Sequence, residues 1–379
     1  MMLIFAIVTY VVFCSVSTVD ASTKAIVAKY PKDLGALFLR GSGCGLNWNS
    51  GVSMTKASNK DGSVQWSHDV QCTSADKGPL EVKVLIGDER WMLGANAFVD
   101  LSANTTSAAE IYPWFFTYTG SLTIVNKVYS SELGNFRDVI FYTPPSYNEN
   151  TLKKHKNVLI MHDGQNLFNP ATSAFGTAWM CQDTLDNLII QGKSDEVIIA
   201  GAYNTNDRMN EYTYVYDPSE KTGGKGDLYL DWIESTLIPL IQKDYRVQLQ
   251  RETLGILGSS LGGLISCYAG WTRSTVYGKV GCMSSSFWWD DVDFISNIMV
   301  NKNPSSAVPV PHIYMDSGTR EDLTCTQYTT QFYNYCLGDG FQADKSVFQY
   351  IDQGGSHSES SWGPRFYIPM QDLYPVTPV

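Results

Sequence analysis

The feature that most constrains this chain is the segment Thr253–Ser266, which reads TLGILGSSLGGLIS. It begins with the apolar residues of a buried strand, turns at a glycine-rich corner, and continues with apolar residues that suit a helix. The corner, Gly258-Ser259-Ser260-Leu261-Gly262, has the G-x-S-x-G pattern. Its glycines let neighbouring backbone pass close by, because they carry no Cβ. The segment predicts a strand–turn–helix unit with Ser260 as a candidate nucleophile; the alternative is an incidental serine in a glycine-rich turn.

A nucleophilic serine needs a base. In proteins with this turn, an acid and then a histidine follow the serine in the chain. Of the five histidines, only His312 and His357 come after Ser260. His312 opens an apolar run that suits a strand, so we interpret it as structural. His357 lies in a glycine-rich loop after a predicted strand, and we predict that it is the base.

The acid that orients the base is expected just after the strand Ile313–Met315. Three carboxylates follow that strand and compete for the role: Asp316, Glu321 and Asp322. Asp316 stands at the strand end, where it could simply brace the turn. The residues alone leave this choice open.

The composition describes a globular protein of more than one domain. The chain has 379 residues, of which 44% are hydrophobic and 17% charged, so it can bury a large core. Its net charge of −11 argues against binding to nucleic acid or to an anionic membrane surface. We therefore expect neither as a partner.

The amino terminus predicts secretion. Residues 1–12 are apolar and small or polar residues follow, so residues 1–21 are expected to form a cleaved signal peptide. No Lys or Arg precedes the apolar run, so a signal anchor or a lipid-tethered start is the alternative. Asn104-Thr105-Thr106 is a sequon for N-glycosylation.

The cysteines indicate one disulfide and at least one free thiol. Seven remain outside the predicted signal peptide. Cys44 and Cys72 are the best candidates for a disulfide, because they stand alone in the first domain. Cys267 and Cys282 fall in the predicted elbow helix and in the next strand, and we interpret them as small buried thiols. No cysteine or histidine spacing suggests zinc, so no metal site is expected.

Residues 22–110 predict a small β-sandwich, because short apolar runs alternate with Gly, Asn and Asp turns without a helical period. Its tryptophans could stack on sugar rings or fill the core: Trp48, Trp66 and Trp91. Residues 41–51 and 82–96 resemble starch-binding-type carbohydrate modules. That resemblance makes a polysaccharide a possible partner.

Residues 120–379 predict a doubly wound, mostly parallel sheet. Continuous apolar runs such as Asn157–Met161 and Glu196–Ala202 suit strands that are buried on both faces. Leu228–Asp244 has helical spacing, and strands and helices alternate from there on. The expected fold is that of an α/β-hydrolase.

A set of motifs resembles the esterase D and ferric-enterobactin esterase-like branch of the α/β-hydrolases, over about residues 120–375. The branch also contains feruloyl esterases and mycolyltransferases. The resemblance implies a serine hydrolase without a cofactor, acting on a small-molecule or carbohydrate-linked ester. The matching residues are Pro144–Tyr147, Met161–Asn166, Arg208–Tyr212, Gly258–Gly263, Ser284–Trp289, Asp316–Gly318 and Gly354–His357.

The same resemblance implies roles for particular residues. The acid would stand three residues after Gly318, at Glu321; mycolyltransferase-like members place it one residue later, so Asp322 is the second choice. The oxyanion donors would be the backbone N–H groups of Leu261 and Gln165.

Four more side chains are candidates for the substrate pocket. Arg208 and Glu211 either form a structural ion pair or shape the pocket. Trp288 and Trp289 either floor the pocket or pack in the core.

The leading hypothesis is a secreted carboxylic-ester hydrolase that acts through an acyl-enzyme on Ser260. The same residues would serve an acyltransferase with a sugar or lipid acceptor. A non-catalytic carbohydrate-binding protein with a decayed hydrolase domain is the alternative from another class.

Overall fold

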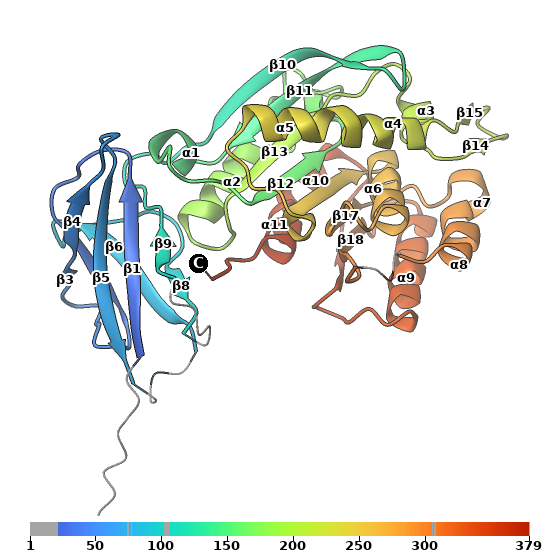
Figure 1. The fold of residues 1–379 in the computed structure, drawn as a ribbon. Helices are drawn as coiled ribbons and strands as arrows, with labels where there is room; N and C mark the ends of the chain where they lie inside the picture. Colours follow the sequence, from blue (N-terminus) through green and yellow to red (C-terminus); the bar gives the residue numbers. More distant parts are fainter. Residues whose placement is uncertain are drawn as a thin grey trace, which may run out of the picture.

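The computed structural model describes residues 22–73, 76, 78–101, 107–304, 306 and 308–378. The predicted signal peptide and the sequon at Asn104 lie outside these residues. The described chain forms a strand-rich amino-terminal domain and a larger α/β domain, which lie side by side with the carboxyl terminus near their junction (Figure 1).

The amino-terminal domain is a β-sandwich, as predicted. One sheet has the order β4-β5-β1-β9, and the other has the order β3-β2-β6-β7 with β8 paired to β6. Residues of both sheets share one buried core, which contains Trp66. The strands are β1 (Ser22–Tyr30), β2 (Leu37–Ser42), β3 (Val52–Ser53), β4 (Thr55–Ser58), β5 (Val64–Cys72), β6 (Leu80–Ile86), β7 (Arg90–Trp91), β8 (Ala97–Val99) and β9 (Ala109–Ile111).

A disulfide joins the two sheets of the sandwich. It links Cys44, just after β2, to Cys72, at the end of β5, with 4.3 Å between the Cα atoms. This pair was predicted from the sequence. Such a bond stabilises a small domain chiefly by restricting its unfolded chain.

The larger domain is built on an eight-stranded sheet with the order β10-β11-β13-β12-β16-β17-β18-β19. β10 and β11 form an antiparallel hairpin, and β11 pairs antiparallel with β13. The other neighbouring strands of this sheet pair in parallel, as the sequence predicted. Its strands are β10 (Ser121–Ser130), β11 (Asn135–Thr143), β12 (Asn157–Met161), β13 (Val197–Ala202), β16 (Leu254–Ser259), β17 (Lys279–Met283), β18 (His312–Gly318) and β19 (Val347–Asp352), and a separate hairpin pairs β14 (Tyr216–Asp217) with β15 (Thr222–Gly223).

Helices cover both faces of this sheet (Figure 1). They are α1 (Ser146–Glu149), η1 (Gly164–Asn166), α2 (Cys181–Ile190), α3 (Arg208–Glu211), α4 (Gly226–Trp232), η2 (Ile233–Leu237), α5 (Ile238–Asp244), η3 (Arg251–Thr253), α6 (Leu261–Thr272), α7 (Trp289–Asp293), η4 (Phe294–Ile298), α8 (Met299–Asn301), α9 (Leu323–Gly338), α10 (Glu359–Arg365) and α11 (Tyr367–Leu373).

Strand β12 shows how the two faces are filled. Its five residues are all buried. Val158 and Ile160 belong to the core under α4, α5, α6 and α9, whereas Leu159 and Met161 belong to the core under α2, α10 and α11. A strand whose residues alternate between two apolar layers reads as a continuous apolar run, which is the pattern seen in the sequence.

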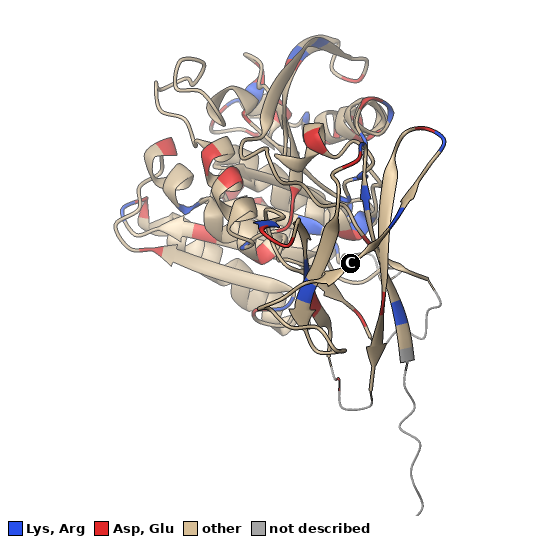
Figure 2. Ribbon diagram, turned by 90° about the vertical axis from the view of Figure 1, so that its left-hand side faces the viewer, with Lys and Arg blue, Asp and Glu red and all other residues tan. Residues whose placement is uncertain are grey.

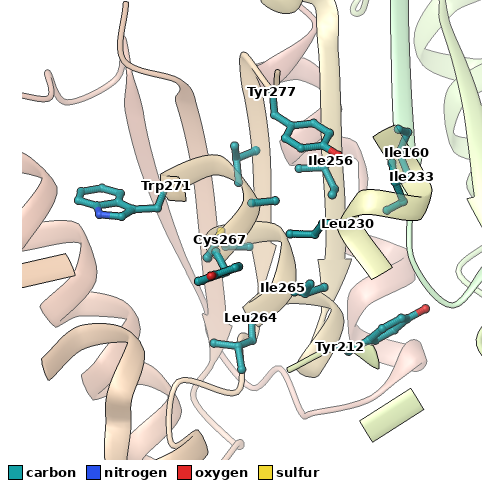
Figure 3. Close-up of a cluster of buried hydrophobic side chains, with 14 of the residues drawn as sticks. Ile160, Tyr212, Leu230, Ile233, Ile256, Leu264, Ile265, Cys267, Trp271 and Tyr277 are labelled. Carbon is teal, nitrogen blue, oxygen red and sulfur yellow. A yellow bond between two sulfur atoms is a disulfide. The ribbon is translucent and has the colours of Figure 1, made fainter. Parts of the chain in front are cut away.

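Helix α6 lies at the centre of the larger core, and Figure 3 shows Ile265 beside Leu230 of α4. Trp271 of the same helix packs against the rings of Phe332 and Phe341. Cys267 of this helix forms a disulfide with Cys282 of β17, and their Cα atoms are 5.8 Å apart. The prediction of two buried thiols was therefore wrong. Helix and strand are adjacent in the fold, and this brings the sulfur atoms within bonding range. The remaining free thiols of the described residues are Cys181, Cys325 and Cys336.

Figure 2 shows acidic and basic residues interspersed over both domains. Among the residues that the structure describes, no helix is long and apolar enough to cross a membrane.

A half-buried carboxylate links the two domains. Glu149, at the end of α1, accepts hydrogen bonds from the backbone N–H groups of Phe115, Phe116 and Thr117 at 2.6, 3.0 and 2.7 Å. It also accepts one from the Tyr30 hydroxyl of the sandwich, at 2.9 Å. One side chain thus orders the linker and contacts both domains.

We predict that Glu149→Ala loosens this junction. The substitution leaves three backbone N–H groups without acceptors, and we expect it to cost on the order of 3 kcal/mol, because hydrogen bonds to a charged group are stronger than neutral ones. Limited proteolysis should then cut within residues 112–120 faster than in the parent protein. Glu252→Ala, which removes an exposed carboxylate, is the control; equal cleavage of the two variants would contradict the assignment.

Candidate active site

The serine elbow has the geometry that its sequence predicts. Ser260 stands between β16 and α6 with φ 58° and ψ −124°, a strained conformation for a residue with a side chain. A Cβ at Gly258 would lie 2.7 Å from the backbone carbon of Gly262 and 2.8 Å from the His162 ring. The glycine is therefore required because the start of α6 passes directly over the end of β16.

The Ser260 hydroxyl opens onto two cavities. Its Oγ lies 3.2 Å from the Ser286 Oγ. One cavity, of about 320 Å³, extends toward Arg208, and the other, of about 300 Å³, extends toward Trp288. His357 lines both cavities beside Ser260. The structure thus brings Ser260 and His357 to one place, although no hydrogen bond joins these two side chains.

The His357 ring is held by a carboxylate on one side and an indole on the other. Its Nδ1 lies 3.2 Å from Glu321 Oε2, and its ring meets the Trp362 ring edge to face at 5.0 Å between centroids. A carboxylate can only accept, so a neutral ring in this position carries its proton on Nδ1. The other nitrogen, Nε2, is then free to accept a proton.

Glu321 is buried in a shell of donors. Oε1 accepts from the Ser284 hydroxyl at 2.6 Å and from the Gly318 N–H at 2.7 Å, while Oε2 accepts from the Cys325 thiol at 2.9 Å. Burial alone would raise the pKa of Glu321, but the hydrogen bonds from His357, Cys325 and Ser284 lower it to about 2. The group is therefore a carboxylate at neutral pH.

The partners of the Ser284 hydroxyl fix the direction in which it donates its proton. It accepts from Trp362 Nε1 at 2.9 Å and from the Arg365 guanidinium at 2.7 Å, and both of these groups can only donate. Its own proton is therefore directed to Glu321. This relay connects Arg365 and Trp362 of α10 to the carboxylate beside His357.

The other two candidate acids have other partners. Asp316 is fully buried and pairs with the Arg365 guanidinium at 2.8 and 3.1 Å, and its pKa is raised by burial. Asp322 is exposed and caps α9 by accepting from the Thr324 N–H at 3.0 Å. Of the three carboxylates, only Glu321 contacts His357.

Arg208 and Glu211 are separated by the fold. Arg208 lines the first cavity and pairs with Asp163 at 2.7 and 2.8 Å. Glu211 is fully buried and pairs with Arg137 of β11 at 3.0 Å. The expectations that Glu211 pairs with Arg208 or shapes the substrate pocket are therefore both wrong. Their partners differ: Arg208 pairs with Asp163 beside the cavity, and Glu211 pairs with Arg137 in the core.

Of the two tryptophans, one lines a cavity of the site and the other packs in the core. Trp288 is 43% exposed and lines the second cavity. Trp289 is buried and donates from Nε1 to the Val215 carbonyl at 3.0 Å. A sequence of two adjacent tryptophans could not reveal which one faces inward.

The predicted oxyanion donors stand at the ends of two parallel strands. Leu261 is the first residue of α6, so its N–H has no partner within the helix. Gln165 lies in η1, just after β12, and its side-chain oxygen accepts from the Asn204 N–H at 3.2 Å. The loop before it is held by the Asp163–Arg208 pair.

Sequence reasoning missed the residues that surround Glu321. Ser284, Cys325 and Arg365 come from three separate segments. Cys325 stands four residues after Glu321, which is a helical spacing and could have been noticed. Ser284 begins the segment Ser284–Trp289, which carried the resemblance, but no local pattern connected it with the acid. Arg365 had no local signal.

A further cavity, of about 430 Å³, lies at the domain junction and not at Ser260. Its lining includes four lysines, namely Lys24, Lys153, Lys154 and Lys156, and four acids, namely Asp100, Glu110, Asp195 and Glu196. The cavity therefore has no excess of either charge that would select a charged ligand.

The fold agrees with the comparisons with known proteins. The chain matches the family described as "Putative esterase" over residues 130–372, and it belongs to this family. It is thus an esterase with an α/β-hydrolase fold. It is 28% identical to the uncharacterized protein YbbA of Bacillus subtilis over 250 residues. The aligned region covers 64% of this chain and 93% of YbbA.

Solved structures extend the likeness to as much as 93% of this chain. A ferulic acid esterase is similar over 68% of this chain and 98% of its own, with 19% identity and a TM-score of 0.53. The enterobactin esterase FES from Shigella flexneri is similar over 93% of both chains, with 14% identity and a TM-score of 0.53. At these identities the likeness shows the fold. The likeness to the enterobactin esterase includes the amino-terminal domain.

The lowered pKa of Glu321 predicts a pH-dependent stability. Because the folded-state pKa is about 2 and the ordinary value is 4.5, the carboxylate stabilises the fold above pH 4.5, and this contribution is lost as the pH falls toward 2. Between pH 7 and pH 3 the loss is about 2 kcal/mol.

Glu321→Gln cannot titrate, so the free energy of unfolding of the parent should approach that of the variant as the pH falls over this range. Urea unfolding at several pH values measures the difference. A constant difference from pH 7 to pH 3 would show that Glu321 has an ordinary pKa in the folded protein.

Proposed function

We propose that this esterase is a serine carboxylic-ester hydrolase in which Ser260 is the nucleophile, His357 the base and Glu321 the acid. The observation that carries the proposal is the hydrogen bond from His357 Nδ1 to the buried Glu321 carboxylate, beside Ser260 in the same cavities. A buried carboxylate in this place stabilises the imidazolium that forms when the ring takes a proton.

The reaction follows from these positions. Ser260 Oγ exchanges its contact with Ser286 for one with His357 Nε2, gives up its proton to that nitrogen and attacks the ester carbonyl carbon. The imidazolium returns the proton to the leaving alcohol, and an acyl-enzyme remains on Ser260. Water enters, loses a proton to Nε2 and attacks the acyl carbon; the imidazolium then gives that proton to Ser260 Oγ as the acid leaves, which restores the free enzyme. Glu321 stays ionised throughout, which its pKa of about 2 permits.

When Ser260 or water attacks, the carbonyl oxygen of the ester or of the acyl-enzyme becomes negative and needs hydrogen-bond donors. The N–H of Leu261, at the start of α6, and that of Gln165, in the loop after β12, are the proposed pair. The Leu261 N–H is supported by its place at a helix start, where the dipole also favours negative charge. Loss of one such donor typically costs about 3 kcal/mol of transition-state stabilisation.

The proposed substrate is a small-molecule ester that spans the two cavities. One cavity contains the polar side chains of Arg208, Asn204 and Glu359, and the other presents Trp288 and serine hydroxyls. An ester seated at Ser260 would place its acyl group in one and its alcohol in the other. Similar structures include esterases named for ferulic acid and enterobactin.

Secretion is also part of the proposal. Two disulfides among the described residues suit an oxidising compartment, where such bonds persist. Together with the apolar segment at residues 1–21, they support an extracellular esterase.

We predict that Ser260→Ala lowers the rate of p-nitrophenyl acetate hydrolysis by about 10⁴-fold or more, because the acyl-enzyme can no longer form. The fold should be unchanged, which circular dichroism can check. Ser286→Ala removes the neighbouring hydroxyl and should stay within about tenfold of the parent, since Ser286 takes no proton in the mechanism. A fluorophosphonate probe should label the parent and not Ser260→Ala. Retained turnover in Ser260→Ala would refute the assignment.

A second function, carbohydrate binding by the sandwich, is favoured by one observation. The rings of Trp48 and Trp91 lie 6.2 Å apart at the sandwich surface, with an angle of 32° between their planes. Trp91 is 37% exposed, and the Arg40 guanidinium, paired with Asp88, lies 5.1 Å from the centroid of its ring. Trp66 takes no part because it is fully buried. Two fixed and accessible indoles suit stacking on sugar rings.

If this is a sugar site, Trp48→Ala and Trp91→Ala should each abolish retention on starch or cellulose beads and leave ester hydrolysis unchanged. Phe116→Ala, which removes another exposed ring, is the control. No retention of the parent protein on either polysaccharide would end the idea.

A further inference from the structure

Cys325 has no role in the proposed reaction, yet it stands against the acid of the site. Its Sγ lies 2.9 Å from Glu321 Oε2, the same oxygen that His357 Nδ1 contacts at 3.2 Å. The three potential ligand atoms of these residues all lie within 4.8 Å of one another. A thiol, an imidazole and a carboxylate are the ligand types that Zn²⁺ prefers.

We propose that Cys325, Glu321 and His357 form an inhibitory binding site for Zn²⁺ or a similar thiophilic divalent cation. The inference rests on the proposed function, because it assigns His357 and Glu321 to catalysis. The ion acts as an inhibitor of this esterase and takes no part in its reaction.

The spacing of the ligands suits such an ion. With bonds of about 2.3 Å to sulfur and about 2.0–2.2 Å to nitrogen and oxygen, tetrahedral ligands of zinc are separated by roughly 3.3–3.6 Å. The two contacts of Glu321 Oε2 are 2.9 and 3.2 Å, so each needs to lengthen by only a few tenths of an ångström. The third separation, from Cys325 Sγ to His357 Nδ1, lies within 4.8 Å and has to become about 3.6 Å. His357, with 40% of its side chain exposed, can move that far.

The surroundings favour a cation and leave it a path. Glu321 Oε1 is already held by Ser284 and Gly318, so Oε2 is the oxygen that faces the ion. The nearest cation, Arg365, lies 3.5 Å from Oε1 and is paired with Asp316 and Asp352. These three carboxylates and one guanidinium leave an excess of negative charge. Cys325 and His357 both line the cavity beside Ser260, through which an ion can enter.

Binding would remove the base. The thiol and His357 Nδ1 each lose a proton to solvent, so that the thiolate and the Nδ1 lone pair bind the ion. Nε2 takes up a proton from solvent, because a neutral ring that binds a metal through Nδ1 carries its proton on Nε2. Nε2 then cannot accept the proton of Ser260, and the contact between Glu321 and His357 is replaced by bonds to the ion.

The test measures binding and inhibition separately. Binding of Zn²⁺ is measured by titration calorimetry, and Co²⁺ serves as a spectroscopic probe, since a bound thiolate gives a charge-transfer band in the near ultraviolet. Inhibition is measured as the Zn²⁺ concentration that halves p-nitrophenyl acetate hydrolysis, relative to each protein's own rate without metal. We expect one ion per chain, and recovery of activity on addition of a chelator.

Cys325→Ala should raise the half-inhibiting concentration by at least about 100-fold, because loss of even an outer partner of a metal ligand costs 10–100-fold. Cys336→Ala removes another buried thiol of the same helix, far from the cavity, and should leave the value unchanged. His357→Ala, at a half-exposed position where folding is not at risk, should abolish the thiolate–cobalt band.

An active parent protein that binds no Zn²⁺, or equal inhibition of Cys325→Ala and Cys336→Ala, would overturn the proposal. A cobalt band that persists in His357→Ala would overturn it as well. Failure of the proposed function gives a different result: the parent protein would lack esterase activity without metal, while the cobalt band still reported on the three ligands.

Discussion

The arrangement of the site depends on one buried carboxylate. Glu321 has no exposed side-chain surface, and it is kept ionised by hydrogen bonds from His357, Cys325 and Ser284 together with the Gly318 N–H. These donors come from the loop after β19, from α9, from the loop after β17 and from the end of β18. A charge removed from water is tolerated only when its oxygens are fully bonded. The carboxylate therefore requires four segments to meet, and it places the His357 ring as a consequence.

The second constraint is the strained turn at Ser260. A positive φ at a residue with a side chain costs free energy, and it persists only where the surroundings leave no alternative. Here the turn is held by backbone hydrogen bonds from Ser260 N–H to the Met283 carbonyl and from Ser286 N–H to the Ser260 carbonyl, both 3.0 Å long. The core around α6, shown in Figure 3, holds the helix against the sheet. Stability of the large core is thus what keeps the nucleophile in place.

Much of the fold could be predicted from local pattern. Continuous apolar runs marked the strands buried on both faces, and short runs between turn residues marked the sandwich. The positions of Ser260 and His357 could also be predicted, because each follows a strand that can be recognised. The choice between Glu321 and Asp322 could not be made from their neighbours. One residue of separation at a helix start decides whether a carboxylate is buried beside the ring or exposed as a helix cap.

Errors arose wherever partners came from distant segments. The disulfide between Cys267 and Cys282 was missed because a helix and a strand, each unremarkable in sequence, happen to lie with their sulfur atoms facing. Glu211 was expected near the cavity, but its partner Arg137 stands on a strand 74 residues earlier. No local pattern carries that information.

By itself, the sequence determined the order of strands and helices, the place of the serine turn and the loop that carries the histidine, because these depend on periodicity and on glycine's lack of a side chain. Only the tertiary structure decided which acid meets the imidazole, which tryptophan faces the cavity and that a thiol stands beside the acid. These outcomes depend on distances between segments that are remote in the chain, and packing of the sheet and its helices sets those distances.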